Sequence, residues 1–415
     1  MSWLGADWPE HRTALPLQGA VQDGAMPKSG APQLAAVAGF FFVSRVSLTF
    51  LLFQASPVTG TLVTIVAGLA LVYFALLCSA GATMNGSQLR MHSSTLTWIA
   101  AFLATSFLSL AWGDAQSVAA AAAYWVALAA DVGAVMLLLR AEIPPEIVSS
   151  LMMGAVWGGV ALSLIGWCAP ATEDLRLGNT EFLHPNTLGL ELGLCVLMAQ
   201  HLSRRGAMWR WIAIGLALTL LRTLSKTAII AFLCAEAWYL LQSRQWTRAA
   251  RVRIAAAAFV AIACFWGVLT AYFDLYSTTS GGQLETLTGR TLLWAIVISV
   301  GVERPWLGHG FYSFKSLVPS LGQFVPVHAH NELLHQFFEL GIAGVVIVIG
   351  IYAAFLRQAW GSVHGELRTL AIALWIFAVV RGLADAVPAE LCFPLWLMAP
   401  LAACLQATHG KARAR

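Results

Sequence analysis

Hydrophobic residues in this chain gather in long continuous runs separated by short polar joints, a pattern that predicts an all-α integral membrane protein. Each run has roughly 17–25 residues, the length with which an α-helix crosses a bilayer. Twelve such runs lie near residues 34–54, 58–81, 95–113, 116–140, 146–168, 185–203, 208–225, 226–242, 252–275, 341–358, 366–384 and 388–407. We therefore expect about twelve transmembrane helices, with the boundary between the seventh and eighth the hardest to place.

One segment, residues 276–340, interrupts this series and is far longer than the other joints. Ordered loops of this length are usually functional. Within it, the pattern predicts a helix over 286–305 and a second over 331–340, capped by Asn331 and broken by Gly341. The expected organisation is a polar tail over 1–33, spans one to nine over 34–275, a catalytic loop over 276–340, spans ten to twelve over 341–407, and a basic tail over 408–415.

The composition supports a membrane protein. Of 415 residues, 59% are hydrophobic and only 11% are charged, whereas a soluble domain carries roughly 25% charged residues. The first thirty or so residues lack the apolar core of a cleavable signal peptide. The seven cysteines lie in or beside apolar runs without the spacing of a zinc site or a disulfide framework, so we interpret them as small buried hydrophobes.

The distribution of lysine and arginine predicts the orientation. With the amino terminus inside, the inner joints carry most of the 24 lysines and arginines, as the positive-inside rule requires. Both termini are then cytoplasmic and the long loop is outside, which in a bacterial inner membrane means the periplasm.

The few outer cations are candidates for substrate binding. Arg222 and Lys226 occupy a tight turn between two spans, and Arg290 begins the first predicted loop helix. A guanidinium presents a planar fork of donors that suits phosphate oxygens. The alternative is that these side chains extend to lipid headgroups or pair with Glu285 or Glu303.

Histidines in the loop are candidates for proton transfer. His328 and His330 flank Ala329 directly before the second loop helix, and histidine is the usual general base near neutral pH. An exposed loop pair, or a metal site completed by Glu332 or His335, are the alternatives. We expect no metal and no cofactor, because no Asp-x-Asp or Glu-x-Asp pair is present to chelate one. Walker A, dinucleotide-binding and nucleic-acid-binding motifs are also absent, so no nucleic acid partner is expected.

Charged residues inside the predicted spans should face the bundle interior. We expect Arg45 to pair with Asp131 or Glu191, and Arg381 to pair with Asp385 four residues later, in a structural role. A further pair, His184 and Asn186, flanks Pro185 at the outer start of the sixth span. These two residues either line the site or form a helix cap.

Four pieces of the chain together resemble the O-antigen ligase and O-antigen polymerase family of bacterial envelope proteins. They are LHPNTLGLELG, RTLSKTA, LTGRTLLWAIVISVGVERPWLGHGFYSF and HAHNELLHQFFELGIAGV, which occur in this order between about residues 182 and 350. The last contains the family pattern of a histidine and a polar residue followed by Gly-x-x-Gly, here His330, Asn331, Gly341 and Gly344.

The resemblance implies a periplasmic glycosyltransferase that takes a glycan from undecaprenyl pyrophosphate without a metal or a nucleotide sugar. The family's two essential arginines correspond to Arg222 and Arg290, and its histidine to His330, with His328 as a frequent companion. We expect Lys226, His328, Asn331, His184 and Asn186 to contribute to substrate binding.

Three functions remain open at this point. A ligase would use a lipid A-core sugar as the acceptor, and a polymerase of O-antigen or exopolysaccharide would use another lipid-linked repeat unit. A transporter of lipid-linked glycans is the alternative of a different class. Transporters usually have paired broken helices in repeated halves. The sequence of this chain has no such repeat, which favours an enzyme. The lipids of the membrane are expected to surround it.

Overall fold

The computed structural model describes residues 30–53, 57–81, 93–168, 176–178, 183–242, 247, 249, 252–253, 256, 287–320, 326–363, 365–386 and 395–413. Every regular element in these ranges is an α-helix. The tail over 1–29, most of the ninth predicted span and the start of the long loop lie outside the described residues.

The described residues before the long loop form eight helices, all of which were expected from the hydrophobic runs. They are α1 (Ala31–Leu52), α2 (Pro57–Gly81), α3 (Ser94–Ser109), α4 (Val118–Ala141), α5 (Pro144–Cys168), α6 (Pro185–Leu202), α7 (Ala207–Arg222) and α8 (Lys226–Gln242). Two of them start at serine caps, because Ser93 and Ser117 accept hydrogen bonds from the backbone N–H groups three residues later. The boundary between the seventh and eighth predicted spans is a turn, since α7 ends at Arg222 and α8 begins at Lys226.

The remaining helices are α11 (Leu287–Gly301), α12 (Phe314–Leu317), α13 (Glu332–Gly361), α14 (Glu366–Gly382) and α15 (Leu395–Arg413). The helix expected over 286–305 is α11, which ends four residues before Pro305. The helix expected over 331–340 is the first part of α13. Asn331 caps α13 as expected, accepting a hydrogen bond from the Leu334 backbone, and the chain leaves helical geometry at Gly341, where φ is 66°.

Among the described residues, four helices are both long enough and apolar enough to cross a membrane: Thr59–Ala80, Val118–Ala141, Pro144–Cys168 and Glu332–Gly361. Shorter apolar helices include Ser94–Ser109, Arg290–Gly301 and Leu395–Gln406. The protein is therefore an all-α, multi-pass membrane protein, while the number of twelve spans and the sidedness stay predictions.

The α1 and α5 helices pack closely in the interior. A Cβ atom at Gly39 would overlap the backbone of Leu151, and one at Gly154 would overlap the backbone of Ala36. Small residues of this kind let membrane helices approach closely. Close approach matters in a bilayer, because lipid tails are as apolar as the helices and dispersion contacts must hold the helices together.

An ion pair lies inside the bundle. The guanidinium of Arg45 is 2.6 Å from the Asp131 carboxylate, and both side chains are buried. This confirms the expected pairing of Arg45 and shows which of its two candidate partners it takes. Pairing is the usual way for charges inside a bundle to be tolerated.

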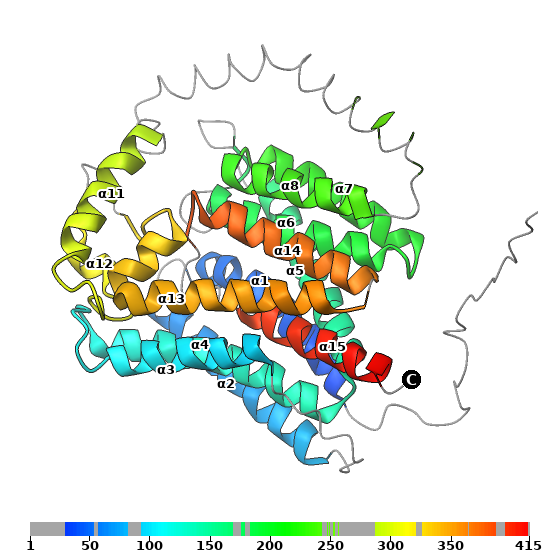
Figure 1. The fold of residues 1–415 in the computed structure, drawn as a ribbon, viewed down its shortest axis with the longest axis horizontal. Helices are drawn as coiled ribbons and strands as arrows, with labels where there is room; N and C mark the ends of the chain where they lie inside the picture. The colour runs from blue at the N-terminus through cyan, green and yellow to red at the C-terminus, as the bar shows by residue number, and fades with distance from the viewer. Residues whose placement is uncertain are drawn as a thin grey trace, which may run out of the picture.

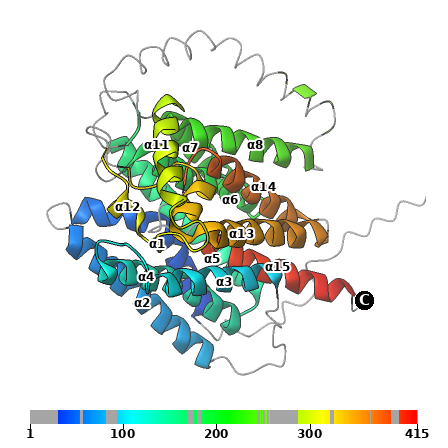
Figure 2. The same ribbon diagram turned by 60° about the vertical axis from the view of Figure 1, so that its left-hand side comes forward.

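The helices α8 and α13 both run antiparallel to α14. Trp238 of α8 donates to the Thr369 carbonyl near the start of α14, so the start of α8 and the end of α14 lie at the same end of the bundle. Trp375 of α14 donates to the Tyr352 carbonyl of α13, which is also antiparallel to α14. Figure 1 shows α11 crossing the left-hand end of this bundle at a steep angle, and Figure 2 shows it there when that end comes forward.

The segment from α11 to α13 has a small core of its own. Its buried members are Leu293, Val297, Phe314, Val318, Ala329 and Phe338. The turn after α11 also bonds to the break in α13, since the N–H groups of Ile342 and Ala343 donate to the carbonyls of Pro305 and Trp306. The described part of the long loop is thus a packed unit held across the end of the bundle.

Candidate active site

Several of the candidate site residues contact one short segment, Leu383–Ala386, which directly follows α14. Asp385 is buried, and its Oδ2 atom lies 2.7 Å from the Arg381 guanidinium. This confirms the expected i, i+4 pair. The purely structural interpretation of that pair was incomplete, because the other carboxylate oxygen of Asp385 contacts a histidine of the long loop.

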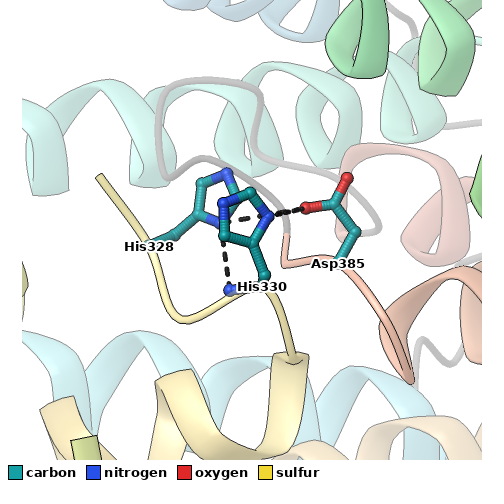
Figure 3. Close-up of side chains that lie close together, drawn as sticks. All are labelled: His328, His330 and Asp385. Atoms are coloured by element: carbon teal, nitrogen blue, oxygen red, sulfur yellow. Dashed lines mark hydrogen bonds and ion pairs between the residues drawn. The ribbon is translucent and has the colours of Figure 1, made fainter. Parts of the chain in front are cut away.

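His330 is held against Asp385 in a strained backbone conformation. Its φ of 50° lies in the left-handed region, which non-glycine residues adopt rarely and mostly at functional sites. Its Nδ1 atom is 3.1 Å from Asp385 Oδ1, which also accepts a hydrogen bond from the Ala386 backbone (Figure 3). An ionised carboxylate can only accept, so the Nδ1 atom of His330 carries the proton and Nε2 carries the lone pair.

Electrostatics keep Asp385 ionised. Burial by itself would raise the pKa of this carboxyl, but the Arg381 guanidinium and the hydrogen bond from His330 outweigh it and hold the pKa well below the usual range. Asp385 therefore stays charged throughout the pH range in which a histidine titrates.

His328 supports the same loop from the other side of Ala329. Its Nδ1 atom accepts a hydrogen bond from the His330 backbone N–H at 3.3 Å and lies 3.8 Å from Asp385 Oδ1 (Figure 3). Burial and the neighbouring His330 lower the pKa of His328 well below its ordinary value. The geometry and the lowered pKa both favour a neutral ring that shapes the loop.

Arg290 and Asn331 bind the two residues before Asp385. The guanidinium of Arg290 donates to the Ala384 carbonyl at 2.7 Å, and the side-chain amide of Asn331 donates to the Leu383 carbonyl at 2.9 Å. A guanidinium has five N–H donors, and this contact uses one of them. Arg290 and His330, forty positions apart in sequence, are thus anchored on adjacent residues.

The other predicted site residues form a cluster around the turn between α7 and α8. Ser225 donates to the Asn186 side-chain oxygen at 3.0 Å, and His184 is the N-cap of α6, accepting from the Asn186 backbone. Arg222 and Lys226 flank this turn. Since α8 is antiparallel to α14, the turn lies at the same end of the bundle as Asp385.

Two functional candidates were missed or undervalued by sequence reasoning. Asp385 was recognised only as the partner of Arg381, and Arg176 was not among the candidate site residues. Arg176 is buried and donates to the Thr223 carbonyl and to the Asn186 side chain. The sequence did offer one indication of both residues. Each is a charged residue near the predicted outer end of a span, and charged residues at such positions are often functional.

The three side chains His328, His330 and Asp385 also satisfy a geometric criterion for a metal site, because one ligand atom from each lies within 4.8 Å of the others. In the present arrangement the Nδ1 atoms of both histidines are already hydrogen-bonded, and Arg381 places a positive charge 2.7 Å from the carboxylate. A cation would have to displace these contacts, so we interpret the cluster as an aspartate–histidine pair.

The glycan transfer that the sequence resemblance implies should therefore survive exhaustive treatment with EDTA. The measurement is the transfer rate of purified protein before and after chelation, with metal content followed by mass spectrometry. Loss of transfer that a single divalent ion restores would contradict the aspartate–histidine interpretation and support a metal at His328 and His330.

Comparison with known proteins supports the resemblance that the sequence motifs indicate. The sequence model of the O-antigen ligase family matches residues 211–349, so this part of the chain is similar to that family. The matched part includes Arg222, Lys226, Arg290, His328 and His330, whereas Arg176 and Asp385 lie outside it.

Two curated relatives agree with the O-antigen ligase assignment. The O-antigen ligase of Pseudomonas aeruginosa is 27% identical over 129 residues, which cover 28% of this chain and 32% of that protein. A protein of Rickettsia conorii, provisionally named a polysaccharide ligase, is 24% identical over 104 residues, 23% of this chain and 25% of its own length. The matched residues thus span about a third of the length of the first relative and about a quarter of the length of the second.

Proposed function

We propose that this protein is an O-antigen ligase-like glycosyltransferase. It moves a glycan from undecaprenyl pyrophosphate to a sugar hydroxyl of the lipid A-core, at the periplasmic face of the inner membrane, without a metal and with inversion. The observation that supports the proposal is the anchoring of Arg290 and His330 on the adjacent residues Ala384 and Asp385, because a guanidinium suited to phosphate and an imidazole paired with a carboxylate are then held by neighbouring residues.

The proposed reaction begins with the acceptor hydroxyl. His330 Nε2 takes its proton while the oxygen attacks the anomeric carbon of the donor sugar. The ionised Asp385 holds the ring in the required tautomer and stabilises the imidazolium that forms. As the new glycosidic bond forms, the bond from the anomeric carbon to the pyrophosphate oxygen breaks on the opposite face of the sugar, which inverts the anomeric centre.

The leaving group is an anion, and the arginines stabilise its developing charge. Arg290 contacts it from the first turn of α11, and Arg222 and Lys226 contact it from the turn between α7 and α8. The polyprenyl tail stays in the bilayer between helices. His328 and Asn331 shape the loop that carries the base, and His184 and Asn186 support the turn that carries Arg222.

The experiment that tests this function is deletion of the gene followed by gel analysis of the cell's lipopolysaccharide. A ligase predicts uncapped core together with long glycan chains left on the lipid carrier. Core that carries a single repeat unit would instead indicate a polymerase. Uncapped core with only unpolymerised repeat units on the carrier would contradict both and indicate a transporter.

Replacing Asp385 with asparagine should lower the single-turnover rate by about a hundredfold or more, the usual contribution of a positioned general base. The neutral amide stabilises imidazolium poorly and no longer fixes the tautomer. Binding of the donor should persist, because Arg222 and Arg290 remain.

Asp114 provides a matched control, because it pairs with His309 at 3.0 Å and with Arg304 at 3.1 Å at the α3–α4 turn. The Asp114→Asn variant removes a similar charge from a similar constellation and should retain the transfer rate per folded molecule. Equal losses in the two variants would mean that Asp385 acts only in folding.

A further inference from the structure

Arg176 binds the turn between α7 and α8 from a third segment of the chain. This arginine precedes α6, and its side chain is 5% exposed. Its Nε atom donates to the Thr223 carbonyl at 3.2 Å, and one terminal nitrogen donates to Asn186 Oδ1 at 2.9 Å. The backbone extends this junction, since the N–H group of Leu177 donates to the Arg222 carbonyl at 3.1 Å.

Hydrogen bonds within the turn also support it, since the N–H groups of Thr223 and Leu224 donate to the carbonyls of Leu220 and Leu221. Leu224 has a φ of 53°, in the left-handed region that a leucine rarely adopts. Thr223 accepts a hydrogen bond from the Ser225 backbone, and the Ser225 hydroxyl donates to Asn186 Oδ1, the same atom that Arg176 contacts. Arg176 and Asn186 together therefore hold a strained conformation in place.

This conformation sets the direction of two cations. Arg222 is the last residue of α7 and Lys226 is the first residue of α8, and Arg176 and Leu177 bind the carbonyls of Thr223 and Arg222. Charge-assisted contacts to phosphate are directional, and a small displacement of the fork weakens them strongly.

We infer that Arg176 is a positioning residue for the donor pyrophosphate, acting through the backbone of residues 222–225 without touching the donor. The inference rests on the proposed function. An arginine suits this role, because its planar fork reaches acceptors on two different segments, whereas the ammonium of lysine is a single point charge.

The first test measures binding of undecaprenyl pyrophosphate, the leaving group of the proposed reaction, to the purified full-length protein. Arg176→Lys and Arg176→Ala should each weaken binding by about tenfold or more. The single-turnover rate of Arg176→Lys at saturating donor should fall as well, but by less than that of Arg222→Ala, because a displaced Arg222 still stabilises part of the charge on the leaving pyrophosphate. The apparent affinity for the acceptor should not change.

Arg304→Lys is the matched control. Arg304 also holds two segments together, through Asp114 and the Trp112 carbonyl, but at the α3–α4 turn. This variant should bind undecaprenyl pyrophosphate as the wild type does. A similar loss of binding in Arg304→Lys and Arg176→Lys would show a general loosening of the fold and would overturn the inference.

A double-variant cycle separates this inference from the proposed function. If Arg176 acts through Arg222 and Lys226, adding Arg176→Lys to Arg222→Ala weakens binding by a smaller factor than Arg176→Lys does in the wild type. Losses that multiply would overturn the positioning role. Weak binding by Arg222→Ala with normal binding by both Arg176 variants would overturn the inference alone, whereas normal binding by Arg222→Ala would overturn the arginine clamp and the inference with it.

Discussion

Arg290→Ala and Arg222→Ala should each abolish glycan transfer while the protein still folds and inserts. Each substitution removes a charge-assisted contact to the leaving pyrophosphate in a partly dry site. Such a loss should cost about 3 kcal/mol or more of barrier, a hundredfold or worse in rate. The measurement is the single-turnover rate of the purified variants, with thermal unfolding as a check that each protein is folded.

Two further variants sharpen this result. Arg290→Lys should also be poor, because an ammonium cannot reproduce the two-pronged contact of a guanidinium with phosphate oxygens. Arg304→Ala removes an arginine from the turn that follows the same helix, α11, and should leave the rate near normal. Near-normal turnover by both Arg290→Ala and Arg222→Ala would show that the pyrophosphate is bound elsewhere.

Replacing His330 with alanine should lower turnover strongly and leave the affinity for the undecaprenyl donor largely intact. The variant loses the group that accepts the proton of the attacking hydroxyl, whereas the arginines still hold the donor. A loss of about a hundredfold to ten-thousandfold is the usual contribution of a positioned base. Donor affinity and single-turnover rate should be measured on the same preparation, because only their divergence identifies a base.

Comparison with His328 gives a second signature of the base. His328→Ala should be milder if His328 only shapes the loop. Wild-type turnover by His330→Ala, or a defect only in donor binding, would remove His330 from this role.

Local features of the fold were predictable from the sequence because local rules decide them. Runs of apolar residues gave the helices, and an asparagine before an apolar run gave the cap of α13. Gly341 was expected to break the pattern because glycine adopts positive φ without a steric cost. A buried acidic partner for Arg45, either Asp131 or Glu191, followed from the high cost of a lone charge between apolar helices, and the structure has Asp131.

The contacts that assemble the site were not predictable, because they depend on how distant segments pack. His330 and Asp385 are 55 residues apart, and only the antiparallel packing of α13 on α14 brings their side chains together. In the sequence, the i, i+4 spacing of Arg381 and Asp385 suggested an ion pair with no further partner. It gave no indication that the other carboxylate oxygen of Asp385 contacts His330. Arg176 was hidden for a similar reason, since its acceptors lie on α6 and on the turn after α7.

Reconstitution of the purified protein tests the central claim most directly. The wild type, with undecaprenyl pyrophosphate-linked glycan, lipid A-core and EDTA in proteoliposomes, should release undecaprenyl pyrophosphate and produce glycan-bearing lipid A-core. Nuclear magnetic resonance of the new glycosidic bond should show an anomeric configuration opposite to that of the donor, and His330→Ala should form almost none of this product. Failure to glycosylate lipid A-core, or a product that retains the donor's configuration, would contradict direct attack by a hydroxyl activated at His330 and Asp385.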